Sequence, residues 1–366
     1  MEIKKVKAHS YLNQIESYKP GKAAIEGKDV VVAKLSSNEN ALGSSKNAIL
    51  SYEKHDKDVF RYADGGCTAL RKAIARKYEV DAENIVCGAG SDEVLYLLAS
   101  AYAGAGDEII HSKHGFLMYD ISARRVGARA VSVAEKNLKT DVEAVIAAIN
   151  NKTKIIFLAN PNNPTGSYLT NDEVKKLIDK TPKDVLIVFD HAYDEFVSGV
   201  SDYPNAIKLV QENDNVVMTR TFSKIYGLAS LRIGWCYSNR EIADVLNKIR
   251  GPFNVGGPAQ VAAKAAIEDE KFTAESLAHN NKWLKKIFAQ ASKYKNIKAL
   301  PSVANFILFD FNSEEAAIKA NEKFLENNVI VRQMGSYFLP NCLRITIGTD
   351  QENELVLKIL AELDLS

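Results

Sequence analysis

Through the first two thirds of the chain, short apolar runs alternate with longer segments whose apolar residues recur at helical spacing. The runs are rich in Val and Ile and are bounded by Gly, Asn and Asp, which is typical of buried strands. They occupy residues 83–90, 107–112, 128–135, 152–160, 184–190, 215–221 and 232–239. Because helical segments separate most of these runs, right-handed β-α-β connections predict a mostly parallel seven-stranded sheet between helices. The pattern therefore predicts an α/β fold for this part.

After about residue 255 the pattern changes. Long amphipathic helical segments cover residues 259–272 and 280–294, and strand-like runs follow at 303–311 and 342–348. We therefore predict a large domain over residues 41–255 and a smaller α+β domain over residues 256–366. Residues 1–40 have no partner in the alternating pattern, so we expect them to pack as an arm on the smaller domain or on another subunit.

Composition narrows the class of protein. The chain has 366 residues, 46% of them hydrophobic and 25% charged, with a formal net charge of +1. This is typical of a globular protein with two domains, and it predicts neither a nucleic-acid partner nor a membrane surface. No signal peptide and no apolar run of about 18 residues is found. The four cysteines are scattered without a CxxC pair, so we expect no metal site and a cytoplasmic location.

Candidate chemistry gathers where the predicted strands end, which is where ligands bind in such a sheet. In "CGAGSDE" two glycines permit a tight turn, and the N–H groups near Ser91 and Asp92 would bind an anion at the start of a helix. The alternative is that both residues only cap that helix. In "ANPNNPTG" two prolines and a glycine stiffen a turn that directs Asn163 toward the strand ends, unless the turn is merely a connection.

Two further strand ends carry charged groups. The run "LIVFDHAYDEF" ends a strand in Asp190, whose carboxylate needs a cationic or donor partner unless it caps the next helix, and Tyr193 lies close behind. In "TFSKIYGLASLRIGW", Lys224 follows a buried strand and Arg232 comes eight residues later. A lysine in a dry pocket becomes an amine nucleophile that can form a Schiff base, and an arginine fork suits a phosphate dianion. Together these parts match what is required to hold pyridoxal phosphate.

At these residues the sequence resembles the fold-type I pyridoxal-phosphate aminotransferases, and within them the histidinol-phosphate aminotransferases. Besides the motifs above, the resemblance rests on "LSSNENALG", "FRYADGGCTALRKAIA" and "CLRITIG", so that it covers nearly the whole chain. The "SNEN" and "RYADG" stretches favour this branch over other aminotransferases. The resemblance implies transfer of an amino group between a small-molecule amino donor and 2-oxoglutarate, by a homodimer with pyridoxal 5'-phosphate as cofactor.

The resemblance also implies a role for each matching position. Lys224 would be the catalytic lysine, Asp190 would pair with the ring nitrogen, and Asn163 and Tyr193 would bond the ring oxygen. Phe116 would stack on the ring. The cofactor phosphate would be met by Ser91, Asp92, Thr221, Ser223, Arg232 and, across the dimer interface, Tyr62. For the substrate, the implied residues are Tyr18, Asn40, Arg332 and Arg344, with Arg344 on a carboxylate and Arg332 on a substrate phosphate.

Two positions depart from the family pattern. His191 stands where the family usually has an acidic residue after the ring-binding aspartate, which alters the surroundings of Asp190. The stretch "SKHGF" replaces a more common proline-threonine-aromatic run before Phe116. The first departure leaves Asp190 in place, whereas after the second the assignment of Phe116 rests on its alignment to the following "MY".

Three other activities remain open at this point. The same chemistry could act on an aromatic amino acid, and the same scaffold could decarboxylate a phosphorylated amino acid. A regulator that uses the fold to sense the cofactor would need a DNA-binding module, and the chain has no basic helix-turn-helix segment. The favoured expectation is histidinol-phosphate:2-oxoglutarate transamination in histidine biosynthesis.

Overall fold

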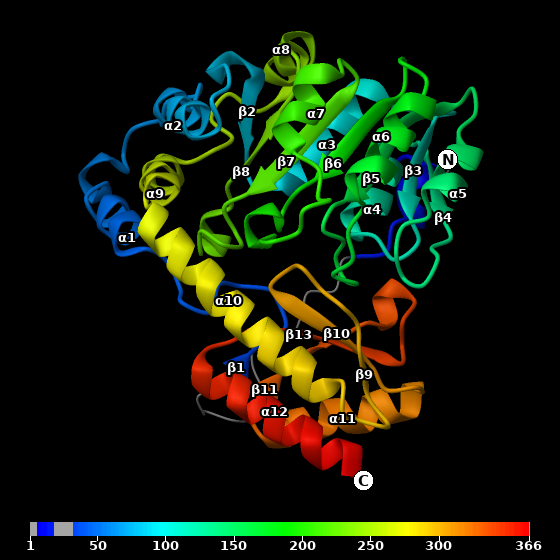
Figure 1. Ribbon diagram of the computed structural model, residues 1–366. Coiled ribbons are helices and arrows are strands. Elements are labelled where there is room, and N and C mark those ends of the chain that lie inside the picture. Colours follow the sequence, from blue (N-terminus) through cyan, green and yellow to red (C-terminus); the bar gives the residue numbers. More distant parts are fainter. Residues whose placement is uncertain (1–5, 18–31, 366) are drawn as a thin grey trace, which may run out of the picture.

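The computed structural model describes residues 6–17 and 32–365. A large part built around a seven-stranded sheet lies above a smaller part with its own sheet, and the long helix α10 (Glu270–Ala291) runs from one to the other (Figure 1).

The large sheet contains one strand from each of the seven apolar runs. Its strand order is β2-β8-β7-β6-β5-β3-β4. Strand β8 is antiparallel to both of its neighbours, and the other pairs are parallel. No α-helix separates β7 from β8, so this pair has no helical crossover and can run antiparallel. The predicted mostly parallel sheet is confirmed, with strands β2 (Ile85–Gly88), β3 (Glu108–Ser112), β4 (Arg129–Val133), β5 (Thr153–Ala159), β6 (Leu186–Asp190), β7 (Val216–Thr221) and β8 (Gly234–Tyr237).

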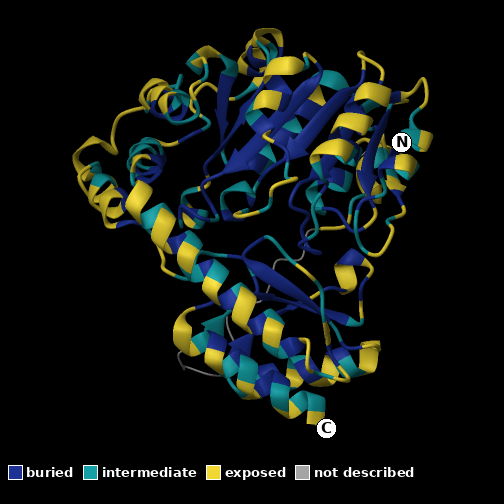
Figure 2. Ribbon diagram, in the orientation of Figure 1, coloured by how far each residue is buried: buried dark blue, intermediate teal, exposed yellow. Residues whose placement is uncertain are grey.

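Helices cover both faces of this sheet, which explains why its strands read as continuous apolar runs (Figure 2). Along β5, Ile155 and Phe157 pack into one core while Ile156 and Leu158 pack into the other. The first core is closed by α3 (Ser91–Tyr102), α4 (Met118–Arg125) and α8 (Arg240–Ile249). The second is closed by α1 (Lys46–Glu53), α2 (Thr68–Tyr78), α5 (Val142–Ala148), α6 (Asn171–Lys180), α7 (Ala206–Glu212) and α9 (Gly257–Glu268).

The smaller part has a third core. An antiparallel sheet with the order β12-β13-β10-β9 packs its apolar side chains with Trp283 of α10 and Phe324 of α11. Strand β1 of the N-terminal segment adds to this part by pairing in parallel with β11. The elements are β1 (Ala33–Lys34), β9 (Lys298–Ala299), β10 (Phe306–Asp310), β11 (Val329–Ile330), β12 (Arg332–Gln333), β13 (Cys342–Thr346), α11 (Glu314–Glu326) and α12 (Asp350–Leu365).

The change of sequence pattern after residue 255 does not coincide with the change of core. Helix α9 lies beside α1 and α2, and Ala262, Ala266 and Ile267 belong to a core of the large sheet (Figure 1). The N-terminal segment touches both parts, because Gln14, in a 3-10 helix, accepts a hydrogen bond from Arg124 of α4 (3.3 Å). Short 3-10 helices are η1 (Ser10–Gln14), η2 (Asp56–Asp58), η3 (Ala82–Asn84), η4 (Asp194–Phe196), η5 (Ala229–Leu231) and η6 (Gly335–Tyr337).

Across residues 6–17 and 32–365, no helix has both the length and the apolar character needed to cross a bilayer.

Candidate active site

A cavity of about 410 Å³ lies between the carboxyl ends of three large-domain strands and the small sheet. The last residues of β5, β6 and β7 line it from one side, and Arg332 and Arg344 line it from the other. The structure brings most of the predicted site residues to this one place: Ser91, Asp92, Phe116, Asn163, Asp190, Tyr193, Thr221, Ser223, Lys224, Arg232, Arg332 and Arg344.

Lys224 sits in the loop that follows β7, with its amine facing the cavity. Its Nζ donates a hydrogen bond to the carbonyl oxygen of Ser37 (3.1 Å) and lies 5.7 Å from the ring centroid of Tyr193. Burial, together with the positive charge of Arg344, lowers the pKa of Lys224 to about 8. At pH 7 about one tenth of this amine is neutral, far more than for an ordinary lysine with a pKa of about 10.4.

The loop around Lys224 is held by the segment that precedes α1. Gly227 has a φ of +67°, and a Cβ there would lie 1.9 Å from the carbonyl oxygen of Gly43. Ser44 Oγ donates to the carbonyl oxygen of Gly227 (2.6 Å), and Asn40 Nδ2 donates to that of Ile225 (2.6 Å). Only glycine permits this close approach, which fixes the lysine loop.

Asp190 ends β6 and is buried beside two hydroxyl donors. Its carboxylate accepts hydrogen bonds from Tyr119 Oη (3.0 Å) and Thr219 Oγ1 (3.0 Å). Burial raises the pKa of Asp190 to about 6, although both hydrogen bonds act in the opposite direction. The idea that Asp190 caps the next helix is wrong, since the following 3-10 helix begins at Asp194 with Tyr193 as its N-cap residue. A cation placed beside this carboxylate would be strongly stabilised.

An anion cradle forms where α3 begins. The N-cap residue is Gly90, which has no side chain to cap the helix, so Ser91 and Asp92 do not serve as the N-cap. A Cβ on Gly90 would lie 2.4 Å from Arg232 Nη2, so glycine is what allows the guanidinium to approach the helix terminus. Arg232 donates to Ser223 Oγ (3.2 Å) and to Asp92 Oδ2 (3.3 Å). Its φ of +49° is strained backbone, a feature that clusters at functional sites.

The opposite wall carries two arginines side by side. Arg332 of β12 and Arg344 of β13 are register partners on antiparallel strands, and both side chains are buried. Arg344 donates to Asn163 Oδ1 (2.5 Å) and to the carbonyl oxygen of Ser36 (2.8 Å), which links the small sheet to the "NPNNPTG" turn. Like charges directly opposite each other on neighbouring strands are destabilising. This wall is therefore suited to an anionic ligand.

Two residues that the sequence did not single out complete the polar surroundings. Asn38 Nδ2 donates to Tyr193 Oη (2.9 Å), and Asn38 Oδ1 accepts from Thr346 Oγ1 (3.1 Å). Tyr119 is the second donor to Asp190. Both lie in stretches already quoted for other residues: Asn38 belongs to "SNEN", and Tyr119 comes three residues after Phe116.

Two predicted residues lie elsewhere, and a third is not among the described residues. The Asn40 side chain does not line the cavity, because it bonds to Ile225 and to Ser276 Oγ (3.0 Å). Tyr62 is 84% exposed and stacks on Phe253, with ring centroids 4.5 Å apart. Tyr18 lies outside the described residues.

His191 lies beside Asp190 in sequence but does not line the cavity. Its Nδ1 is 3.0 Å from Tyr203 Oη and 3.2 Å from Asp194 Oδ1, and Tyr203 Oη donates to the carbonyl oxygen of Asn160 (2.6 Å). Asp194 in turn pairs with Arg220 of β7. His191, which differs from the acidic residue usual in the family, is therefore part of a buried polar network separate from the cavity.

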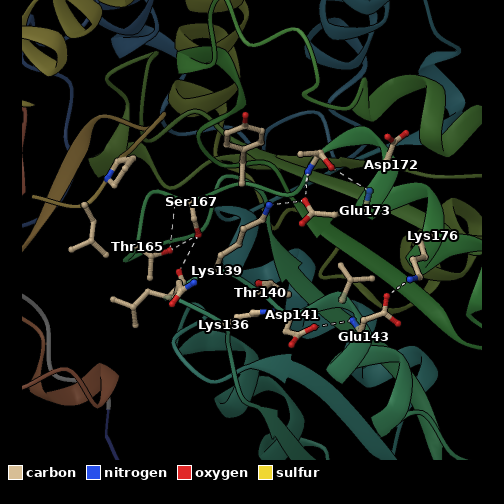
Figure 3. Close-up of a pocket in the computed structure, with 17 residues that line it drawn as sticks. Lys136, Lys139, Thr140, Asp141, Glu143, Thr165, Ser167, Asp172, Glu173 and Lys176 are labelled. Atoms are coloured by element: carbon tan, nitrogen blue, oxygen red, sulfur yellow. Dashed lines mark hydrogen bonds and ion pairs between the residues drawn. The ribbon is translucent and has the colours of Figure 1, made fainter.

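A larger cavity, of about 680 Å³, lies beside the turn at residues 136–139 (Figure 3). Two ion pairs lie along it, Lys139 with Glu173 (2.7 Å) and Lys176 with Glu143. None of the predicted site residues that the structure describes lines it. Among the described residues, no group of three or more His, Cys, Asp or Glu side chains could hold a metal ion.

The family model described as aminotransferase class I and II matches residues 30–360. The chain belongs to this family. It is therefore an aminotransferase, and the cavity described above contains the residue types that its chemistry requires.

Similar proteins agree with this assignment. The chain is 48% identical over 350 residues to the histidinol-phosphate aminotransferase of Paramagnetospirillum magneticum, covering 95% of this chain and 96% of that protein. It is 44% identical to the histidinol-phosphate aminotransferase of Maricaulis maris, again covering 95% and 96% of the two chains. Among solved structures, the histidinol-phosphate aminotransferase from Sinorhizobium meliloti in complex with pyridoxal-5'-phosphate is similar, with a TM-score of 0.85, 28% identity and 91% of each chain covered.

The pKa of Lys224 gives a direct test of the site. Only the neutral amine reacts with acylating reagents, and its fraction rises as the pH rises through the pKa. In the cofactor-free protein we expect acylation of Lys224 to be half-maximal near pH 8, against about 10.4 for an ordinary lysine. Peptide mass mapping after short pulses at different pH values measures this, with the exposed Lys271 as internal control. Acylation of Lys224 only in the ordinary lysine range would contradict the inferred burial effect.

Proposed function

We propose that this chain is a pyridoxal-phosphate-dependent histidinol-phosphate:2-oxoglutarate aminotransferase of histidine biosynthesis. The observation that carries the proposal is the arrangement of one cavity: a reactive lysine and a buried carboxylate lie between an anion cradle and a pair of buried arginines. The names of relatives at 44–48% identity over almost the whole chain support the choice of substrate.

The residues of the cavity fit the cofactor. The uncapped start of α3, with Ser91, Ser223, Thr221 and Arg232, offers donors for a phosphate dianion in a cradle that a Cβ at position 90 would fill. Asp190 would pair with a protonated ring nitrogen, Asn163 and Tyr193 would bond the ring oxygen, and Phe116 would stack on the ring. When bound, pyridoxal phosphate supplies an aldehyde carbon and a ring that withdraws electrons from the reacting carbon.

The chain itself supplies proton transfer and positioning. Lys224 Nζ, with a pKa of about 8, can accept the proton from the substrate Cα as a general base and afterwards donate it to a different carbon as a general acid. Its hydrogen bond to the Ser37 carbonyl oxygen and its position over the Tyr193 ring hold the amine within the cavity. Positioned proton transfer of this kind contributes about 10² to 10⁴ in rate.

The arginine wall would orient the two substrates in turn. Arg344 would bind a carboxylate of 2-oxoglutarate through its planar fork. Arg332 would then bind the second anionic group, which is the phosphate of histidinol phosphate in one half-reaction and the distal carboxylate of 2-oxoglutarate in the other. Because both arginines are buried and adjacent, a ligand with a dianionic end is stabilised there more than a neutral one.

The assembly we propose is a homodimer in which Tyr62 completes the partner's phosphate site. Large exposed apolar side chains gather in the segment around Tyr62 and at Phe253, namely Leu50, Val59, Phe60, Tyr62 and Phe253. Exposed apolar residues in one region are typical of protein-protein interfaces. In a dimer this surface would be covered, and Tyr62 would reach the neighbouring site.

Replacing the buried carboxylate tests its role. Asp190→Asn keeps the shape and removes the charge that would hold the ring nitrogen protonated. We expect turnover to fall by about 10²-fold or more, while the dissociation constant for pyridoxal phosphate, measured by calorimetry, changes less than about tenfold because the phosphate cradle is intact. Unchanged turnover would contradict the assignment.

Complementation tests the dimer. We expect Tyr62→Ala and Lys224→Ala each to be inactive or nearly so, and a mixture of the two, co-refolded, to recover activity because a heterodimer contains one intact site. Each variant refolded alone is the control. A fully active monomer at micromolar concentration, by light scattering, would rule out the shared site.

Arg332→Ala tests the substrate. An arginine-phosphate contact contributes more than the ~1 kcal/mol of an ordinary hydrogen bond, and about 1.4 kcal/mol corresponds to a factor of ten. We expect kcat/KM for histidinol phosphate to fall at least about tenfold, with a much smaller change for an amino donor without phosphate. A panel of donors with the wild-type protein, read from cofactor absorbance in half-reactions, is measured alongside. Equal losses for both kinds of donor would favour an aromatic amino acid aminotransferase.

A further inference from the structure

Lys34 lines the cavity but has no role in the function described so far. It belongs to β1, the strand that the N-terminal segment adds to the small part (Figure 1). Side chains alternate between the two faces of a strand. Ala33 and Leu35 pack into the core of the small part, so Lys34 and Ser36 point to the other face, which is the cavity.

Arg332, in the strand β12 that follows directly after β11, lies on the same face. Lys34 is the register partner of Ile330 in β11, and Arg332 comes two residues later. Val329 and Val331 pack into the core, so Ile330 and Arg332 share the face that carries Lys34. Two residues along a strand span about 7 Å. The ammonium of Lys34 and the guanidinium of Arg332 therefore approach the cavity from adjacent positions.

The partner of Lys34 can be exchanged for a ligand. Its Nζ is 2.6 Å from Glu39 Oε1, and the two side chains are 33% and 40% exposed. Partly exposed ion pairs contribute little to stability, so an anion that enters the cavity can take the place of Glu39. When no anion is bound, the ion pair with Glu39 keeps Lys34 at the wall of the cavity.

The charge of the ligand calls for a second cation beside Arg332. A phosphate monoester carries close to two negative charges at neutral pH. Arg344, the other cation of this wall, already donates to Asn163 and to the Ser36 carbonyl oxygen. A single guanidinium would leave part of the phosphate charge unbalanced in a partly buried site.

We propose that Lys34 is a specificity-determining residue that binds, together with Arg332, the phosphate of the amino donor. This inference rests on the proposed function and adds to it a residue from the N-terminal strand. If Lys34 has this role, recognition of the substrate requires that β1 pairs with β11, because this pairing sets the distance between Lys34 and Arg332.

The test compares Lys34→Gln, Lys34→Arg and a matched control, Lys319→Gln, in the holoenzyme. Lys319 is also in the small part and also paired with a glutamate (2.8 Å), but it is exposed and lies on α11. We expect Lys34→Gln to raise KM for histidinol phosphate about tenfold with kcat little changed, and to leave the kinetics with histidinol unaffected. Lys34→Arg should retain most of the wild-type KM, and Lys319→Gln should match the wild type.

Binding of propyl phosphate, an unreactive phosphate monoester, to the holoenzyme by calorimetry gives an independent readout, and we expect Lys34→Gln to weaken it by a similar factor. If Arg332→Ala weakens phosphate recognition selectively and Lys34→Gln does not, the role of Lys34 is overturned while the proposed function stands. If the wild type does not prefer the phosphorylated donor, the proposed function fails and this inference with it. Equal effects of Lys34→Gln on histidinol and histidinol phosphate would also overturn it.

Discussion

Removal of one lysine amine from bulk water is the constraint on which the rest of the site depends. Burial lowers the pKa of Lys224 to about 8, and a buried amine must be held by a loop that admits little water. That loop packs against the segment before α1 so closely that Gly227 has no room for a side chain. The large sheet provides the fixed platform, because β7 ends directly before the loop and is covered on both faces.

Charged groups face this amine from both parts of the molecule, and Arg232 adds a cation on the large-domain side. Asp190 and the start of α3 belong to the large domain, and Arg332 and Arg344 belong to the small sheet. The hydrogen bond from Arg344 to Asn163 joins the two halves, so the residue proposed to hold a substrate carboxylate also orients a residue proposed to face the cofactor ring.

The sequence was sufficient to predict the large sheet, because buried strands appear as apolar runs. It was also sufficient to predict that the polar groups at the strand ends lie together, because the carboxyl ends of parallel strands meet at one edge of the sheet. It could not identify the partners of these groups. Tyr119 and Asn38 reach Asp190 and Tyr193 across separations of 71 and 155 residues, and no local pattern records such contacts. It also could not assign α9, since an amphipathic pattern shows that a helix has an apolar face but not which core covers it. Nor could it show that Gly90, rather than Ser91 or Asp92, occupies the N-cap position of α3.

The division into separate cores has an evolutionary consequence. Lys34, Arg332 and Arg344 lie on strands whose opposite faces pack into the core of the small part. Lys224, Asp190 and the anion cradle lie at the edge of the large sheet, which has its own cores. Substitutions in β1 or β12 would therefore reshape the arginine wall while Lys224 and Asp190 stay in place on the large sheet. A substitution of Arg344 in β13 would act on both halves, because Arg344 also donates to Asn163. New substrate ranges are accessible to this scaffold by small steps in β1 or β12, each of which leaves a working catalytic half in place.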